Sequence, residues 1–505
     1  MSFTSVARVI TVAGSDAANG AEADYATLSA AVTAVTAQTR TAAARWRIEV
    51  LASTTEPGPI AAWPSFVDLR IRAGATVTFP GAGITATGVT ASISGDGRSA
   101  RIDAAGTAIA LAGATDITIE DLTLNTTAGT TVTNASTGTV TIDRCNVIGT
   151  TGALVHSSAG TITSTDSRYT ATTGPGASIT GTGSVTMVAG VMSSATGSAF
   201  SCTAAASIDL DNCRMTTTGG LAGGLITAAA AGSNVTRCQF VAAGSTTSVG
   251  LYLTGTAGNA RFAQCYARGG SDGVSIDGMT VAAEFVQCTA IAGALPGINF
   301  PHGWFVRNCS QTAAVSFVQC YGHGGSSAAN SGQSGTGMTL ANGLYHLHGG
   351  NYRGPANTAS GAYGIEVTGN TAGAITTAHL YNVTAIGGEN CTGGAAFGLS
   401  CDNTSWAGVG TQNLHIRGGV FRGGVLGTAS PGIRIGQGTT VATCSIEGVT
   451  AVGGGVQGGV RGSAVQATIA WPTAQLSGEF DGTIDPLITP AAPAAGSSFT
   501  IARTT

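Results

Sequence analysis

The stretch Val140-Thr141-Ile142-Asp143-Arg144-Cys145 contains in six residues the pattern that decides the fold of this chain. Two apolar residues stand two apart, two polar residues follow, and a small residue closes the unit. The same order returns at Ile208-Asp209-Leu210-Asp211-Asn212-Cys213, and shortened forms are Phe262-Ala-Gln-Cys265, Phe285-Val-Gln-Cys288 and Phe317-Val-Gln-Cys320. Apolar residues two apart predict a β-strand with one buried face.

The small position of this pattern recurs at intervals of 22 to 36 residues, which marks a solenoid. The shorter intervals leave no room for a helix in each turn, so we predict an all-β fold, a right-handed single-stranded parallel β-helix with a short N-terminal capping helix. The small positions are Leu122, Cys145, Ser167, Gly190, Cys213, Cys238, Cys265, Cys288, Cys320, Gly350, Val383, Gly419 and Val449.

A second series predicts a further strand in each turn of the C-terminal half. It has the form glycine, apolar, any residue, apolar, and we expect its glycines to lie at corners that need unusual backbone angles. The series begins at Gly250, Gly273, Gly297, Gly337, Gly364, Gly398 and Gly432.

Cysteine fills many of the small positions, where a thiol serves as a small apolar side chain. The spacing lacks the paired Cys-x-x-Cys arrangement of zinc sites, so an inward stack of free thiols is the prediction, with disulfides or metal as the alternative. The residue before each small position forms a polar column, expected to hydrogen-bond from turn to turn at a corner: Asp121, Arg144, Asp166, Asn212, Arg237, Gln264, Gln287 and Gln319.

The N-terminal residues 1–80 are expected to form a cap. Strands are predicted at Arg8–Val12, Trp46–Leu51 and Val67–Arg72, and a helix from Asp24 to about Thr39 that covers the open end of the stack. The β-helix is expected over residues 81–470, with longer loops after about residue 288, and a C-terminal cap or extended tail over residues 471–505.

Composition excludes several classes of function. The 21 cationic residues are all arginine and the formal net charge is −4, so no basic surface for nucleic acid is expected. The opening residues lack the pattern of a secretion signal and no run of 18 apolar residues follows, so no membrane insertion is expected. No cofactor is expected either.

The segment Asp24-Tyr25-Ala26-Thr27-Leu28-Ser29-Ala30-Ala31-Val32, followed by Arg47–Leu51, resembles the N-terminal cap of the pectinesterase and pectate-lyase-like superfamily. Phage tail spikes share this β-helix fold and kind of cap, so the resemblance implies fold more than activity. Where the esterases of that superfamily carry Gln-Asp and Asp-Phe-Ile-Phe-Gly motifs, this chain has Gln319-Cys320-Tyr321 and no such pentapeptide. Esterase activity is therefore not implied.

Three histidines, His346, His379 and His415, fall four residues before the small position in consecutive turns, and His348 lies two along from the first. We expect them to stack on the outward face within ~5–7 Å of one another. They are a candidate metal site or pH-sensitive contact, and the alternative is that the rings line a contact between subunits or stack in solvent.

Two pairs of carboxylates are candidate catalytic groups, because glycosidases use two carboxylates, one as acid and one as nucleophile or base. Glu120 and Asp143 are expected in adjacent turns, and Asp209 and Asp211 on one strand. The alternative is that these outward acids only keep the surface soluble.

The turns after Cys288 lengthen through loops rich in Gly, Ser and Asn, at 322–337, 354–364, 387–398 and 424–432. Binding residues concentrate in such loops. Trp304, Tyr363 and Trp406 lie in or beside them and are candidates for stacking on sugar rings, the alternative being that they pack the loops against the stack.

These features together favour a bacteriophage tail spike or tail fibre protein, located in the virion, that binds a host-surface polysaccharide or spaces the receptor-binding tip from the tail. A low-charge surface rich in Thr and Ala predicts association, so a homotrimer that contacts other phage tail or baseplate proteins is expected. The alternatives are a polysaccharide depolymerase, a hydrolase or lyase on the same fold, and a bacterial surface adhesin.

Overall fold

The computed structural model of this chain is composed almost entirely of parallel strands. The structure describes residues 8–13, 24–244, 246–293, 301–325, 335–355, 361–369, 374–388, 396–401, 411–424, 432–435, 440–447, 449–452 and 460–462. Trp406, the predicted tail at 471–505 and most of the four long loops lie outside these ranges. The chain falls into two compact units, Met1–Gly220 and Leu221–Thr505, and each is described by itself.

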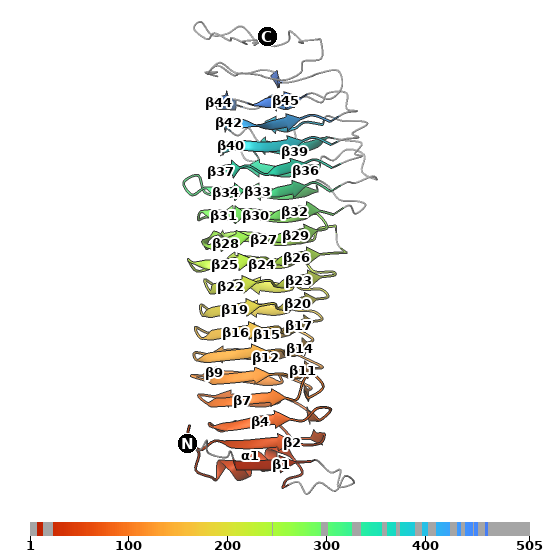
Figure 1. The fold of residues 1–505 in the computed structure, drawn as a ribbon, viewed down its shortest axis with the longest axis vertical. Coiled ribbons are helices and arrows are strands. Elements are labelled where there is room, and N and C mark those ends of the chain that lie inside the picture. Colours follow the sequence, from red (N-terminus) through yellow and green to blue (C-terminus); the bar gives the residue numbers. More distant parts are fainter. Residues whose placement is uncertain are drawn as a thin grey trace, which may run out of the picture. The chain divides into compact units, whose positions relative to one another are not determined.

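Most turns of the first unit contribute strands to three ladders, one more than the minimum that the sequence predicts (Figure 1). The first ladder contains β1 (Arg8–Val12), β2 (Trp46–Val50), β4 (Val67–Ile71), β7 (Thr90–Gly95), β10 (Asp116–Glu120), β13 (Thr139–Asp143), β16 (Thr161–Thr165), β19 (Ser184–Val188) and β22 (Ser207–Asp211). The second contains β3 (Thr54–Thr55), β5 (Thr76–Phe79), β8 (Arg101–Ala104), β11 (Thr123–Thr126), β14 (Asn146–Gly149), β17 (Arg168–Ala171), β20 (Val191–Ser194) and β23 (Arg214–Thr217). The third contains β6 (Ile84–Thr87), β9 (Ile109–Gly113), β12 (Thr130–Ser136), β15 (Gly152–His156), β18 (Ala177–Ile179) and β21 (Phe200–Cys202).

The second unit repeats this arrangement, with longer strands in much of its third ladder, and a 3₁₀ turn, η2 (Ala257–Asn259), precedes β28. Its first ladder contains β25 (Ser233–Thr236), β28 (Ala260–Ala263), β31 (Ala283–Val286), β34 (Val315–Val318), β37 (Gly343–His348), β40 (Ile375–Ile386), β42 (Thr411–Arg422) and β44 (Thr440–Glu447). The second contains β26 (Gln239–Ala242), β29 (Tyr266–Gly269), β32 (Thr289–Ala292), β35 (Tyr321–His323), β38 (Asn351–Arg353), the later parts of β40 and β42, and β45 (Thr450–Val452). The third contains β24 (Ala222–Ala228), β27 (Val249–Thr256), β30 (Asp272–Met279), β33 (His302–Arg307), β36 (Gly335–Ala341), β39 (Ala362–Thr368), β41 (Leu399–Cys401), β43 (Ile433–Ile435) and β46 (Val460–Gly462).

Both units are right-handed parallel β-helices, which confirms the predicted fold class. The apolar residues of the repeat point inward and stack on their equivalents in the next turn: Ile117 pairs in register with Val140, and Ile119 with Ile142, all buried. Burial of each such side chain stabilises the fold by roughly 1.5–3 kcal/mol. In the second unit Phe262, Phe285 and Phe317 stack with centroids 5.0 and 5.3 Å apart.

The predicted polar column forms the corner between the first and second ladders, and every member has a positive φ, from 48° at Asp166 to 56° at Asp121. The sequence predicts the corner but not this left-handed backbone. Side chains connect the turns as expected: Gln264 Nε2 donates to Gln287 Oε1 (3.3 Å), and Gln287 Nε2 to Gln319 Oε1 (3.1 Å). Corner amides also donate to the strand of the next turn, as Arg144 N does to Thr165 O (2.9 Å).

Nine cysteines lie in the described part of the chain with their burial defined, and all are buried free thiols. Those at the small positions follow the left-handed corner residue, and their thiols donate hydrogen bonds to backbone carbonyls, as Cys145 Sγ does to Asp143 O (3.2 Å). Cys202, Cys309 and Cys401 lie instead at or just beyond the ends of third-ladder strands. The prediction of one inward stack is therefore correct only for the cysteines at the small positions.

The glycine series has a different cause from the one expected. Gly250, Gly273, Gly337, Gly364 and Gly398 have no positive φ; a Cβ on Gly337 would instead lie 2.5 Å from Arg353 N of the second ladder. Glycine is required because two backbones approach closely at this crossing. Gly297 lies outside the described residues, and Gly303 fills this position in its turn, in register with Gly337 through Trp304↔Met338.

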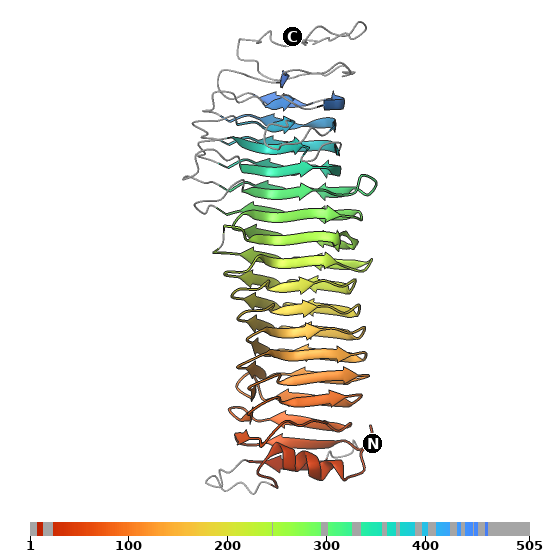
Figure 2. The same cartoon turned by 180° about the vertical axis from the view of Figure 1, so that it is seen from behind.

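The predicted capping helix is shorter than expected. It runs from Leu28 to Thr36 (α1), with Thr27 as N-cap, and lies at the N-terminal end of the first unit (Figure 2). Its apolar face, Leu28, Ala31, Val32 and Val35, is buried as predicted. Glu56, 1% exposed, accepts hydrogen bonds from the amides of Leu28 and Ser29 (both 2.8 Å), so a buried carboxylate satisfies the first turn.

Among the described residues, no helix has the length and apolar character needed to cross a membrane.

Candidate functional site

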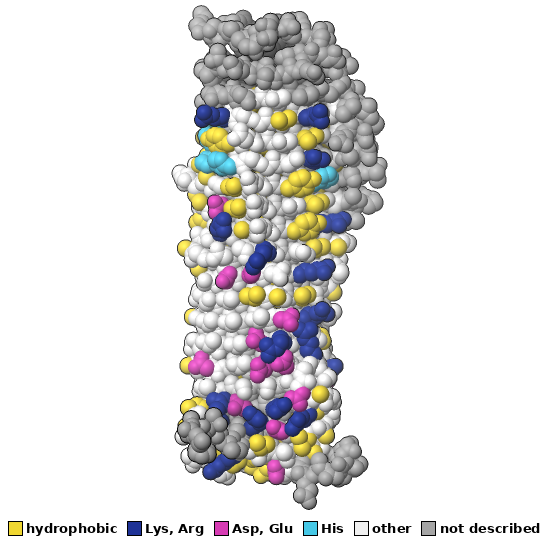
Figure 3. Space-filling view, viewed as in Figure 1, with side chains coloured by type: hydrophobic (Ala, Val, Ile, Leu, Met, Phe, Trp, Pro, Cys, Tyr) yellow, Lys and Arg dark blue, Asp and Glu magenta, His cyan; other side chains and the backbone are white. Residues whose placement is uncertain are grey.

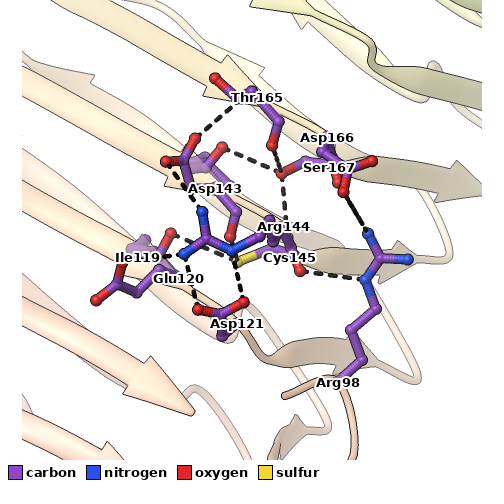
Figure 4. A network of polar contacts seen from close by, with 11 residues as sticks. Arg98, Ile119, Glu120, Asp121, Asp143, Arg144, Cys145, Thr165, Asp166 and Ser167 are labelled. Atoms are coloured by element: carbon purple, nitrogen blue, oxygen red, sulfur yellow. Dashed lines mark hydrogen bonds and ion pairs between the residues drawn. The ribbon is translucent and has the colours of Figure 1, made fainter. Parts of the chain in front are cut away.

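The structure brings Glu120 and Asp143 together as predicted, in register on β10 and β13. Both carboxylates are ion-paired with Arg144, whose Nη2 lies 3.4 Å from Glu120 Oε2 and whose Nη1 lies 3.8 Å from Asp143 Oδ2 (Figure 4). The two acids therefore share a guanidinium from a corner residue. A glycosidase acid must instead be held protonated beside the glycosidic oxygen, an arrangement that this pair does not resemble.

Asp121 and Arg98 complete this network at the corner. Arg144 donates to both oxygens of Asp121 (2.7 and 2.8 Å), and this contact lowers the pKa of Asp121. Arg98 reaches across two turns to donate to the carbonyls of Arg144 (3.1 Å) and Asp166 (2.8 Å) (Figure 4). These contacts hold successive left-handed corners, which is a structural task.

Asp209 and Asp211 lie on β22 as predicted, with Asp209 exposed and Asp211 half-buried. In register they face Thr186 and Val188 of β19. Neither acid lines the depression of about 380 Å³ at Arg261 and Glu284 or the groove of about 290 Å³ at Arg47 and Asp68. Their catalytic role stays a prediction.

The expectation that Trp304 is exposed is wrong. It is fully buried, its Nε1 donates to Tyr321 O (3.0 Å), and its ring contacts Phe285 and Phe317 at 5.3 and 5.1 Å. In this turn the glycine, apolar, any, apolar pattern is formed by Gly303-Trp304-Phe305-Val306. Trp304 therefore occupies the first apolar position, which points inward. It is therefore part of the core and cannot contact a sugar.

Tyr363 is also mostly covered. It is 9% exposed, and its ring stacks on Phe397 with centroids 5.4 Å apart. Trp406, the third predicted aromatic residue, lies outside the described residues.

The histidines stack on the outward face of the second unit as predicted. His346 pairs in register with His379, and His379 with His415. Their ring centroids lie 5.0 and 4.7 Å apart, and His348 lies 6.3 Å from His346 and stacks on Tyr381 at 4.9 Å. Burial and the neighbouring imidazoles lower the pKa of His379, and burial and His348 lower that of His346.

The metal site predicted from these histidines is not found. Within the ranges that the structure describes, no three His, Cys, Asp or Glu side chains are grouped so as to hold a metal ion. The rings follow one another along the ladder at the spacing of the turns, so their nitrogens do not converge on one point.

The histidines belong to a longer outward surface, which we call the histidine strip. It consists of two adjoining columns on β34, β37, β40 and β42, one with histidine in three of four turns and one with Val318, His348, Tyr381 and Arg417. In Figure 3 histidine side chains lie next to hydrophobic ones over the region where Figure 1 labels β37 and β40. The strip is Ser316, Val318, His346, His348, His379, Tyr381, His415 and Arg417.

A shallow depression of about 380 Å³ precedes the strip on the same outward face. Arg261 and Glu284 lie along it, joined by an ion pair of 2.9 Å, and Ser316 borders it. Because Ser316 pairs in register with His346, the depression leads directly onto the histidines. The second unit therefore has a continuous track of polar, aromatic and apolar side chains along the ladder.

The first unit has a charged groove of about 290 Å³ that was not predicted from the sequence. Arg47, Asp68, Arg70, Asp96 and Glu120 line it, and Figure 3 shows acidic and arginine side chains intermixed over the region of β2 and β4. The sequence feature that could have indicated this groove is the alternation of charges, Arg-x-Glu on β2 and Asp-x-Arg on β4. The register that pairs Arg47 with Asp68 and Glu49 with Arg70 was needed to interpret it.

The charges of this groove are mutually paired. Arg70 lies 2.9 Å from Asp96, and the nearly buried Glu49 is 3.1 Å from Arg72. Burial raises the pKa of Asp68, but hydrogen bonds from Arg45 and Ser92 outweigh it, so the pKa lies below its usual value. Asp68 is therefore ionised at neutral pH and is not a proton donor.

No protein-family model and no curated protein matches this sequence. Among solved structures, the chain is similar to the A-module of the mannuronan C-5 epimerase AlgE6 of Azotobacter vinelandii. The alignment has 11% identity and a TM-score of 0.23, and covers 89% of this chain and 92% of that chain. A similarity of this size assigns no function, and the fold assignment rests on the strand pairings described above.

Proposed function

We propose that this protein is a structural subunit of a bacteriophage tail spike or tail fibre that binds a host-surface polysaccharide along the second unit without cleaving it. The observation that carries the proposal is the track formed by the depression at Arg261 and Glu284 and the histidine strip. Rings and hydrocarbon surfaces bind the faces of sugars, and polar side chains beside them fix orientation.

The regular ladder suits a polymer better than a small molecule. Equivalent side chains recur every ~4.8 Å along a parallel ladder, so an extended chain meets similar contacts in successive turns. His346, His379 and His415 provide three such equivalent positions. Each contact is weak, but a polymer that spans several turns gains from all of them.

The acids described above favour binding over cleavage. Glu120 and Asp143 share Arg144, and the carboxylates of the charged groove are engaged by arginines. A polysaccharide depolymerase remains the second candidate, because Glu120 borders a groove rich in polar groups.

We further propose that three copies associate in the virion and contact other tail or baseplate proteins. Support comes from the low charged fraction, 9%, and from exposed apolar side chains such as Leu221 (74% exposed) and Val188 (37%). Burial of such side chains against another copy removes apolar area from water.

The test combines light scattering, an array of bacterial surface polysaccharides and an assay for released reducing ends. We expect a trimer that binds at least one polysaccharide and releases nothing. Tyr381→Ala should weaken binding about two- to tenfold, since an aromatic contact contributes ~0.5–1.5 kcal/mol. Thr163→Ala, an outward threonine of the first unit, is the matched control and should bind normally.

A monomer, or binding that Tyr381→Ala leaves unchanged, would contradict the proposal. Release of reducing ends that Glu120→Gln abolishes would replace it with the depolymerase.

A further inference from the structure

We propose that the histidine strip recognises an acidic polysaccharide, and that a carboxylate-bearing sugar unit docks over His346 and His379 with uptake of protons. This inference rests on the proposed function for the place of binding and adds the chemical class of the ligand.

The first step is the closeness of the rings. His346 and His379 have centroids 5.0 Å apart with ring planes at 87°, and His379 and His415 stack 4.7 Å apart at 10°. All three side chains are half-buried on the outward face, so each is partly accessible to solvent. A ligand that lies along the ladder therefore meets several imidazoles at once.

The second step is that, among the residues that the structure describes, no carboxylate occupies the outward positions around His346 and His379. The outward positions of β34 carry Ser316 and Val318, and those of β37 carry Leu344, His346 and His348. On β40 and β42 they carry Thr377, His379, Tyr381, Asn413, His415 and Arg417. The nearest acid described on this face, Glu284, is paired with Arg261 at 2.9 Å, and on β44 Glu447 pairs in backbone register with Arg417, not with a histidine.

The third step is electrostatic. Among the described residues, positive charge on His346 or His379 meets neighbouring imidazoles and no carboxylate, so an anion from solution is the group that stabilises it. Burial and neighbouring imidazoles already lower the pKa of His346 and His379, so at neutral pH the rings are uncharged. A bound carboxylate favours the protonated ring, and by linkage the affinity rises as pH falls.

Tyr381 and Arg417 make the same surface suitable for an acidic sugar in particular. Tyr381 stacks on His348 at 4.9 Å and is half-buried, which leaves ring surface for a pyranose face. Arg417 lies one turn further along the same column and is exposed. A ring contact next to cationic groups fits a sugar with an apolar face and a negative substituent.

The experiment measures the affinity of the full-length protein for an oligoglucuronic acid and for its methyl ester by calorimetry. The two ligands share a backbone and differ in charge. At about pH 5.5 the acid should bind at least about tenfold more tightly than at about pH 7.5, because histidine titrates between these values. The ester should show less than about a threefold change over this range, since it offers no charge to the imidazolium.

Two variants of the central residue separate charge from structure. His379→Asn should remove most of the pH dependence, whereas His379→Arg should retain binding of the acid and make it independent of pH. His323→Asn is the matched control: burial lowers the pKa of His323 too, but it lies on β35 in the second ladder. This control should bind like the native protein.

An equal pH dependence in the native protein and in His379→Asn would overturn the inference, as would an identical pH profile for the ester. Binding of the ester that is independent of pH but weakened by Tyr381→Ala would leave the proposed function standing without this inference. If no polysaccharide binds at any pH, the proposed function itself fails.

Discussion

In each turn, the corner between the first and second ladders is the position whose backbone conformation most restricts the type of residue. A non-glycine residue in the left-handed region costs roughly 1–2 kcal/mol. Asp, Asn, Gln and Arg nevertheless occupy the corner, because their side chains join one turn to the next, as Gln287 does between Gln264 and Gln319. Backbone strain at this position is therefore offset by contacts that a glycine would not make.

Ala189 is the exception, since it has φ 54° but no polar group with which to join the column. We expect Ala189→Asn to raise the free energy of unfolding by about 0.5–1 kcal/mol, because Asn adopts this backbone more readily than Ala. Thermal unfolding of the full-length protein provides the measurement. Ala189→Val is the control and should destabilise by more than about 1 kcal/mol, because a β-branched side chain at positive φ is strained.

Gly337 tests the close crossing of the third and second ladders. A Cβ at this position would lie 2.5 Å from Arg353 N and 2.6 Å from Gly364 O. Gly337→Ala should destabilise the second unit by about 2 kcal/mol or more, since the backbone must shift to make room. Gly81→Ala is the matched control, because its added Cβ would meet no atom within 4 Å and its φ is ordinary. Equal melting temperatures for the two variants would disprove the explanation.

At this scale the sequence predicted side-chain direction well where the period of two was intact, as in the outward stacking of His346 and His379. It failed where the wrong glycine of a turn was assigned to the crossing. Gly297 and Gly303 both precede an apolar, any, apolar sequence, and only the strand register shows that Gly303 is used. With that register Trp304 points inward, and a predicted binding residue becomes a core residue.

Among the elements, α1 depends on an acid that comes from outside the helix. Glu56 accepts hydrogen bonds from the amides of Leu28 and Ser29, and also from Ser29 Oγ and Thr54 Oγ1. Glu56→Ala should lower the free energy of unfolding by about 1–3 kcal/mol, because buried amides lose their acceptors. Hydrogen exchange of these two amides should accelerate. Glu56→Gln, which keeps the side-chain volume and one carbonyl oxygen, should have a smaller effect; full stability in Glu56→Gln would indicate that side-chain volume, and not the paired carboxylate oxygens, is the cause.

The first ladder of the second unit should lose stability in acid. The pKa values of His346 and His379 lie below the ordinary value in the folded state, so the unfolded chain binds more protons as pH falls below about 6.5. The stabilising contribution is therefore complete above that pH and is lost as pH falls toward the folded-state pKa. Melting temperatures between about pH 7.5 and about pH 5 should fall less in His346→Gln/His379→Gln than in the native protein. A parallel fall in both would exclude these histidines as the cause.

Strands of the first ladder could be predicted because they end just before the small position and recur with it. The second ladder was missed, because its strands of four residues or fewer, such as Arg168–Ala171, follow the small position where the sequence indicated only a turn. The third ladder was found only in part, since its strands in the first unit, such as Gly152–His156 and Phe200–Cys202, follow turns of variable composition. The charged groove was missed for a related reason. Its residues come from four turns, and no single segment of the sequence contains the set.

On the scale of the whole molecule, the chain has few charged residues, and many of those in the first unit form ion pairs with one another. The acids and arginines of the first unit neutralise one another in the network of Arg144 and in the groove of Arg70. In the second unit the histidine strip lacks described carboxylates at its outward positions, which is where an external anion is expected. The two units therefore offer different surfaces, one internally compensated and one open to an acidic ligand.

The buried thiols make it possible to measure how often individual turns of the β-helix open. Burial raises the pKa of Cys145 to about 12 and those of Cys202 and Cys309 to about 11, so the reactive thiolate is scarce while their turns stay closed. Each of these three cysteines therefore reports on the opening of its own turn, because it reacts with an alkylating reagent only when that turn separates from its neighbours. Mass spectrometry of peptides after graded alkylation would order the turns by their frequency of opening, without a label added to the chain.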